Sequence, residues 1–199
     1  YENIIGRSRA FCGVIYPWLR EHFAPRLDDV SQEDFYRMIN KAQPSLIRTE
    51  ADELTYCLHI MVRYELERRM FAGELTAHDL PAEWNRLYKA YLGVDVPNDR
   101  EGILQDSHWA NGNIGYFPSY AIGSAYGAQY LRQMQKDFDV SAAVATGRLT
   151  QINCWLEDKI WKYGCMKDPT PLFESVCGPF DPTCYTAYLR DKFTEVYGL

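Results

Sequence analysis

The sequence predicts an all-α fold. Apolar residues recur at intervals of three and four along most of the 199-residue chain, as they do on the buried face of an amphipathic helix. No segment shows the apolar–polar alternation of a half-buried strand. Prolines and glycines separate the periodic segments, where helices are expected to begin and end. With 47% apolar residues, the chain can also bury a sizeable core.

The first predicted helix extends from Tyr1 to about Phe23, and Pro17 should kink it. Its apolar residues follow helical spacing up to Pro25, which ends it. A second helix is predicted over residues 31–40, because a serine stands at its start and acidic residues occupy its first turn.

The third predicted helix covers residues 50–72. Residues 46–48 before it are expected to be extended, with Thr49 as the N-cap, and Gly73 should end the helix. One face of this helix is apolar. The charged run over residues 63–69, in its far half, is expected to be solvated.

The remaining helices follow turn signals in the same way. Leu80 and Pro81 open a helix that Gly93 should end. Five further helices are predicted, over residues 118–137, 141–146, 150–163, 171–176 and 185–197. No repeat or interior linker divides the chain, so we expect a single domain or one piece of a larger domain.

Composition limits the possible partners and the compartment. The chain carries 27 acidic and 21 basic residues, a net charge of −6, so no general attraction to nucleic acid or anionic membrane is expected. No apolar run approaches the roughly twenty residues that cross a bilayer. The six cysteines are expected to be free thiols in a reducing cytoplasm, although Cys177 and Cys184 could pair if oxidised. The four histidines are too scattered to make a metal site by themselves.

The polar stretch over residues 102–120 is the strongest candidate for chemistry. It combines amide, carboxylate, imidazole, indole and phenol groups with glycines that hold the backbone in turns. Such a loop can direct several hydrogen-bond donors at one point, which stabilises developing negative charge in an active site. A surface loop with packed aromatic residues is the alternative that the residue types leave open.

Two motifs resemble those of a known family. The stretches Ile47-Arg48-Thr49-Glu50-Ala51-Asp52 and Gly102-Ile103-Leu104-Gln105-Asp106-Ser107-His108-Trp109 are similar to the Ile-Arg-x-x-Ala-Asp and Gly-x-x-Gln-Asp-x-His-Trp motifs of the M32 metallocarboxypeptidases, the carboxypeptidase Taq family. Shorter similar phrases begin at Tyr1, Asp79 and Gly115, so the resemblance covers essentially the whole chain.

The resemblance implies a piece of a longer zinc enzyme that removes C-terminal residues from peptides. Members of the family carry a His-Glu-x-x-His helix and a third, glutamate ligand upstream of the position of Tyr1. Residues 1–199 would then be the C-terminal helical part of one larger catalytic domain, without the metal ligands and the general base, and inactive alone. The helices would form one wall of a deep substrate groove, as in neurolysin and angiotensin-converting enzyme, and the parent enzyme would be a homodimer.

The resemblance also implies catalytic roles for three residues. His108 would donate a hydrogen bond to the tetrahedral oxyanion or to the substrate backbone. Tyr116 and Tyr120 would add phenolic donors. Either tyrosine could instead be a packed aromatic residue, since the two lie four positions apart where a helix begins. For His108 the alternative is a loop histidine whose hydrogen bonds are satisfied within the protein.

Three further residues would bind substrate. Arg48 is the expected anchor for the terminal carboxylate, because a guanidinium offers a fixed bidentate fork. Gln105 and Asp106 would orient His108 or bind the substrate backbone. Arg48 could instead form a structural ion pair with one of the acids close by in sequence, Glu50, Asp52 or Glu53. His59 is expected to be a core histidine, or one that supports the site from behind, and not a catalytic residue.

Two other classes of function remain open from the sequence. The chain could be a stand-alone helical module that uses Arg48 and the aromatic loop to hold a peptide C-terminus without cleaving it. It could also be a helical scaffold whose charged face, residues 63–69, binds a partner.

Overall fold

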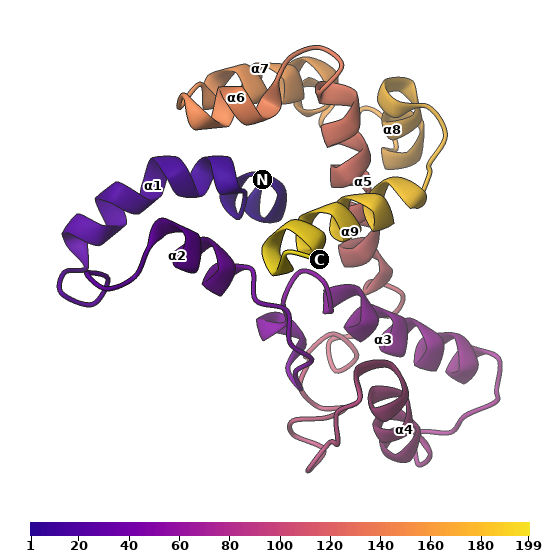
Figure 1. The fold of residues 1–199 in the computed structure, drawn as a ribbon. Helices are drawn as coiled ribbons and strands as arrows, with labels where there is room; N and C mark the ends of the chain where they lie inside the picture. Colours follow the sequence, from indigo (N-terminus) through magenta and orange to yellow (C-terminus); the bar gives the residue numbers. More distant parts are fainter. The chain divides into compact units, whose positions relative to one another are not determined.

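The computed structural model describes residues 1–199 and contains helices and loops but no strand, which confirms the predicted all-α class (Figure 1). The α-helices are α1 (Arg9–His22), α2 (Gln32–Ile39), α3 (Tyr56–Phe71), α4 (Leu80–Leu92), α5 (Pro118–Met134), α6 (Val140–Ala145), α7 (Leu149–Lys159), α8 (Pro169–Cys177) and α9 (Thr183–Tyr197). Three short helical turns complete the list: η1 (Glu2–Gly6), η2 (Arg48–Glu50) and η3 (Trp161–Tyr163). None of the helices combines the length and the apolar character that a membrane span requires. The six cysteines form no disulfide.

Contacts along the chain define two compact units. Unit one comprises residues 1–41 and 124–199, and unit two comprises residues 42–123. Helix α5 begins in unit two and continues into unit one. All six residues that the sequence predicts for the site lie in unit two.

Unit one has a core in which α1 packs against α6 and α2. Its main apolar cluster contains Ile5, Met134, Val140, Val144, Ile152 and Trp155. These residues come from η1, α5, α6 and α7, each of which contributes the apolar stripe that the sequence shows. A smaller cluster joins α1, α2 and α9 through Cys12, Tyr36 and Val196.

Ile152→Val is expected to destabilise unit one by about 0.5–1.5 kcal/mol, because Ile152 is buried on α7 and the lost methyl group leaves a small cavity. The midpoint of denaturant unfolding measures this change. The control is Ile122→Val on α5, where the side chain is exposed and no change is expected. Equal midpoints for the two variants would contradict the assignment of Ile152 to the core.

Unit two is organised around the packing of α3 on α4. Its core contains Val62, Leu66, Leu80, Trp84, Leu87, Tyr88 and Leu92. The start and end of α4 agree with the sequence prediction. Pro81 lies in its first turn, and Gly93 ends it with φ +69°, a left-handed conformation that favours glycine.

Several predicted helix boundaries are wrong. The helix predicted over residues 150–163 ends at Lys159 and is followed by the separate turn η3. The first predicted helix is divided into η1 and α1, because the Ser8 side chain accepts a hydrogen bond from the Phe11 backbone N–H and caps a new helix. Helix α3 begins at Tyr56, and Thr49 is not its cap. The Asp52 carboxylate accepts hydrogen bonds from the backbone N–H groups of Leu54 and Thr55, and this local bonding competes with helix formation.

The prediction that residues 63–69 form a solvated charged run is also wrong. Arg63 is completely buried and Glu67 is nearly so, although Arg68 and Arg69 remain accessible. Arg63 and Glu67 lie one turn apart on α3 and find polar partners in the loop after residue 102. The face that a scaffold protein would offer to a partner is therefore partly buried within unit two.

Candidate functional site

The candidate site is formed by η2, α3, the loop over residues 102–117 and the first turn of α5, all within unit two. The loop begins where the chain packs closely on itself. A Cβ atom at Gly102 would lie 2.7 Å from Val96 Cγ1 and 3.0 Å from the carbonyl oxygen of Asn98, so a larger residue would displace the start of the loop.

Asp106 joins two arginines. Its Oδ1 atom accepts hydrogen bonds from Arg48 Nε at 2.9 Å and Arg48 Nη2 at 2.7 Å. Its Oδ2 atom accepts from Arg63 Nε at 2.7 Å and lies 2.5 Å from Arg63 Nη2. The side chains of all three residues are less than 10% exposed. Arg48 thus pairs with Asp106, 58 positions away, and not with one of the nearby acids.

Burial would by itself raise the pKa of Asp106, but hydrogen bonds from Arg48 and the charge of Arg63 outweigh it. The pKa of this carboxyl therefore lies below its usual value of 3.8, and Asp106 is ionised at neutral pH. In turn, Asp106 raises the pKa of Arg48 in spite of the opposing effect of burial.

Gln105 fixes the backbone beside this cluster. Its Oε1 atom accepts from the Arg48 backbone N–H and from Arg63 Nη2, both at 2.9 Å. Its Nε2 atom donates to the carbonyl oxygens of Leu46 and Glu101. Gln105 and Asp106 therefore act on the two arginines, and neither forms a hydrogen bond with His108.

The second group of predicted residues lies around the His108 imidazole. Its Nε2 atom is 2.9 Å from the Tyr120 hydroxyl, and its ring centroid is 4.3 Å from that of Phe117. The Nδ1 atom is buried without a hydrogen-bond partner. The Tyr116 ring packs 5.4 Å from the Tyr120 ring at nearly a right angle and is 50% exposed.

Aromatic rings link the two groups. The Arg48 guanidinium carbon lies 5.0 Å from the centroid of the Tyr120 ring and 5.7 Å from that of Phe117. Tyr120 therefore contacts both the imidazole and the guanidinium, through its hydroxyl and its ring face respectively. The structure thus brings all six predicted residues into one neighbourhood.

Sequence reasoning missed Arg63, Tyr56 and Glu67. The Tyr56 hydroxyl accepts a hydrogen bond from Arg48 Nη1 at 2.9 Å. Glu67 accepts one from the indole N–H of Trp109 at 2.6 Å. A signal for Arg63 was present, because it lies four residues after His59 and three before Leu66, in line with buried positions of α3.

His59 is buried, as predicted for a core histidine, and its Nδ1 atom lies 3.1 Å from the Tyr88 hydroxyl. Burial lowers its pKa from 6.5 to about 4, and the positive charges of Arg63 and Arg48 act in the same direction. The unfolded chain therefore binds a proton here at a higher pH than the folded chain does.

Because protonation favours the unfolded state, stability should fall as the pH is lowered from 6.5 to about 4, with a His59 contribution of about 3 kcal/mol. Unfolding midpoints measured across this range check the prediction. His59→Gln should remove most of this pH dependence, whereas His78→Gln, at an exposed position, should keep it. An unchanged pH dependence in His59→Gln would refute the assignment.

The possible metal ligands of the chain, His, Cys, Asp and Glu, do not gather in one place in this structure. No group of three or more His, Cys, Asp or Glu side chains is arranged to hold a metal ion. Of the acidic residues of the site, Asp106 is already occupied by two guanidinium groups, and Glu67 accepts a hydrogen bond from Trp109.

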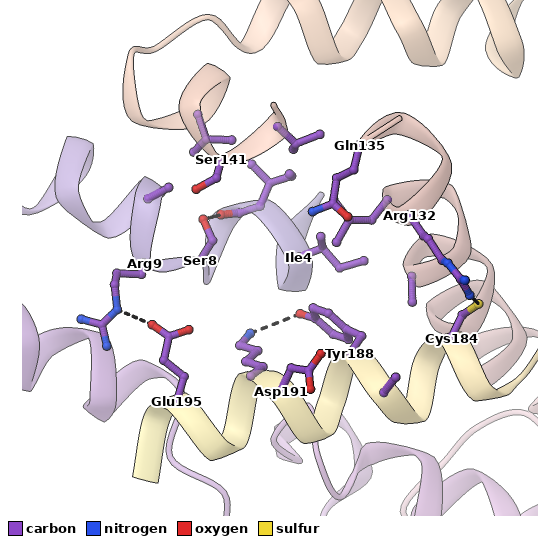
Figure 2. A pocket seen from close by; sticks show the side chains of 18 of the residues that line it. Ile4, Ser8, Arg9, Arg132, Gln135, Ser141, Cys184, Tyr188, Asp191 and Glu195 are labelled. Atoms are coloured by element: carbon purple, nitrogen blue, oxygen red, sulfur yellow. Dashed lines mark hydrogen bonds and ion pairs between the residues drawn. The ribbon is translucent and has the colours of Figure 1, made fainter. Parts of the chain in front are cut away.

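A cavity of about 670 Å³ is lined by residues of unit one (Figure 2). Four of its charged side chains are engaged with neighbours: Arg9 pairs with Glu195, Arg132 Nη1 lies 3.2 Å from Cys184 Sγ, and Lys192 donates to the Asn3 carbonyl oxygen. None of the six predicted site residues lines it. The candidate site is therefore the arginine and imidazole groups of unit two.

Two relatives and two solved structures are similar to this chain over nearly all its length. Carboxypeptidase 1 of Bacillus subtilis (strain 168) is 42% identical over 199 residues, which are 99% of this chain and 40% of the relative. Thermostable carboxypeptidase 1 of Thermus thermophilus is 41% identical over 200 residues, 100% of this chain and 39% of the relative. This chain thus spans about 40% of the length of each relative.

The M32 carboxypeptidase from Deinococcus radiodurans R1 superimposes with a TM-score of 0.95 at 39% identity, covering 100% of this chain and 41% of that chain. The Pyrococcus furiosus carboxypeptidase structure gives a TM-score of 0.93 at 40% identity, covering 97% of this chain and 39% of that chain. The family model described as carboxypeptidase Taq (M32) metallopeptidase matches residues 1–193. With the fold, the two motifs and this match in agreement, the chain belongs to the M32 family of metallopeptidases.

Proposed function

We propose that this chain is the C-terminal part of a metallocarboxypeptidase and that it supplies the groups that bind the terminal carboxylate of a peptide. The observation that carries the proposal is the state of Arg48. A guanidinium has five N–H groups. Three of them bond to Asp106 and Tyr56, and two have no acceptor in the protein.

Arg48 is suited to bind a carboxylate because its orientation is fixed by hydrogen bonds and two of its N–H groups are still available. Asp106, Tyr56 and Gln105 fix its orientation, so little side-chain freedom is lost when a ligand binds. Its side chain is 8% exposed, so its charge acts where water screens it little. The two remaining N–H groups can form charge-assisted hydrogen bonds with carboxylate oxygens.

We assign the stabilisation of negative charge on the reacting carbonyl oxygen to His108, Tyr116 and Tyr120. The buried Nδ1 atom of His108 has no partner, and such an atom is unfavourable unless a ligand or water bonds to it. Tyr120 holds the opposite ring nitrogen, which fixes the orientation of the imidazole. Tyr116 is half exposed and so accessible to a substrate.

For the complete enzyme we propose a zinc ion, held together with the general base by residues in the part of the relatives that this chain does not match. When bound, zinc would polarise the carbonyl and lower the pKa of its water. We also propose a homodimeric enzyme of the cytoplasm. The groove between helical halves, of which unit two would form part of one wall, belongs to the same proposal.

The complete protein should release C-terminal residues from peptides with a free carboxylate and should not act on the corresponding C-terminal amides. Removal of metal with a chelator should abolish the activity, and added zinc should restore it. Residues 1–199 alone should be inactive. Metal-dependent hydrolysis by residues 1–199 alone would overturn the division of the site proposed here. Binding of free-acid peptides without hydrolysis by the complete protein would instead support a non-catalytic binding module.

A further inference from the structure

We infer that Arg63 is a positioning residue that makes the neighbouring Arg48 selective for a carboxylate. The inference rests on the proposed role of Arg48 and adds a second arginine that does not touch the substrate. Arg63 would act in two ways. It fixes Asp106 and Gln105, which hold Arg48, and its charge keeps the buried cluster positive.

Arg63 has no capacity left for a ligand. Its Nε–H donates to Asp106 and its Nη2 group to Gln105. Its Nη1 group donates to the His59 carbonyl oxygen at 2.7 Å and to the Tyr88 hydroxyl at 3.3 Å. Four of the five N–H groups thus donate hydrogen bonds, and the Nη2 group also lies in ion-pair contact with Asp106.

The surroundings of Arg63 point to the same conclusion. Its side chain is 0% exposed, and its guanidinium carbon lies 4.6 Å from the centroid of the Trp84 ring. A group that is saturated and enclosed in this way can act on a substrate only through its neighbours. Arg48, with two N–H groups without a protein acceptor, is the neighbour that remains open.

The link from Arg63 to Arg48 passes through two shared acceptors. Asp106 offers one carboxylate oxygen to each arginine. Gln105 Oε1 accepts from Arg63 Nη2 and from the Arg48 backbone N–H, both at 2.9 Å. Arg63 therefore restrains the guanidinium of Arg48 through Asp106. It restrains the main chain of Arg48 through Gln105.

The charge balance of the cluster depends on Arg63. The two guanidinium groups form ion pairs with the same carboxylate, so the three side chains carry a net charge of +1. Without Arg63, Arg48 and Asp106 would form a neutral pair. A neutral pair attracts an anionic group much less than a buried cluster with an excess positive charge does. The excess charge should therefore favour a free carboxylate over its amide.

The test uses the complete protein and measures binding as well as activity. Calorimetry gives the Kd of an N-acyl amino acid, which carries the product's carboxylate, and of its uncharged amide. Arg63→Met should raise the Kd of the acid about 10- to 50-fold and leave that of the amide unchanged. With a peptide substrate, KM should rise by a similar factor and kcat should change less than about threefold.

Arg63→Lys keeps the charge and should recover most of the lost affinity for the acid. Arg86→Met is the matched control, because Arg86 is an exposed arginine of α4 that pairs with Glu83, and it should bind both ligands as the wild type does. An unchanged Kd of the acid in Arg63→Met would overturn the inference. Equal weakening of acid and amide binding, or no recovery in Arg63→Lys, would also overturn it. Failure of the wild-type protein to bind the acid would instead refute the proposed function of Arg48.

Discussion

Arg48→Met in the complete protein is expected to lower kcat/KM for peptides with a free C-terminal carboxylate by about 30- to 5000-fold. This range corresponds to the 2–5 kcal/mol typical of truncating one partner of a buried, hydrogen-bonded charge pair. The variant removes both N–H groups that have no acceptor in the protein. Steady-state kinetics on a short peptide would measure the loss, with most of it in KM.

Arg48→Lys should recover little of this activity, because an ammonium cannot reproduce the planar fork that bonds to Asp106 and still reaches a second carboxylate. Arg37→Met is a suitable control, since Arg37 forms an exposed ion pair with Glu33 on α2. This variant should retain full activity. Wild-type kinetics in Arg48→Met would exclude Arg48 as the carboxylate anchor.

Asp106→Asn is expected to have the largest effect on stability, a loss of about 3–5 kcal/mol. The carboxylate is bonded by two buried guanidinium groups, and its removal leaves their like charges close together without an acid between them. Denaturant unfolding of the complete protein would measure the change. Arg63→Met should be less harmful than Asp106→Asn, because the remaining Arg48–Asp106 pair is neutral.

The control for Asp106→Asn is Asp95→Asn. Asp95 is 85% exposed and pairs with Lys89 at the surface. The free energy of unfolding of the Asp95→Asn protein should therefore hardly differ from that of the wild type. Similar unfolding curves for the two variants would show that the buried cluster is not a major source of stability.

The sequence predicted the helices better than the partners of charged residues. Helix α4 is bounded by Pro81 and Gly93, and both signals act within a few residues, so its limits could be predicted. The predicted start of α3 was too early, because the Asp52 carboxylate accepts hydrogen bonds from nearby backbone N–H groups in a turn. Helix propensity alone does not decide between this turn and a helix.

Long-range pairing explains what was missed in the site. Arg48 has three acids close by in sequence, yet its partner is 58 positions away, and Arg63 reaches the same carboxylate across 43 positions. A charged residue on a helix gives the same local pattern whether it faces water or a buried carboxylate. The six predicted site residues came from motif similarity, and their roles remain predictions.

The polar ties between α3 and the loop have a consequence for the thermodynamics of binding. Arg63 and Glu67 stand one turn apart on the helix and bond to Asp106 and Trp109 of the loop. Two anchors so close together, both largely shielded from water, hold this stretch of backbone in one conformation before a ligand arrives. Ligand binding then costs little conformational entropy in the loop. More of the free energy of each new hydrogen bond therefore contributes to the affinity.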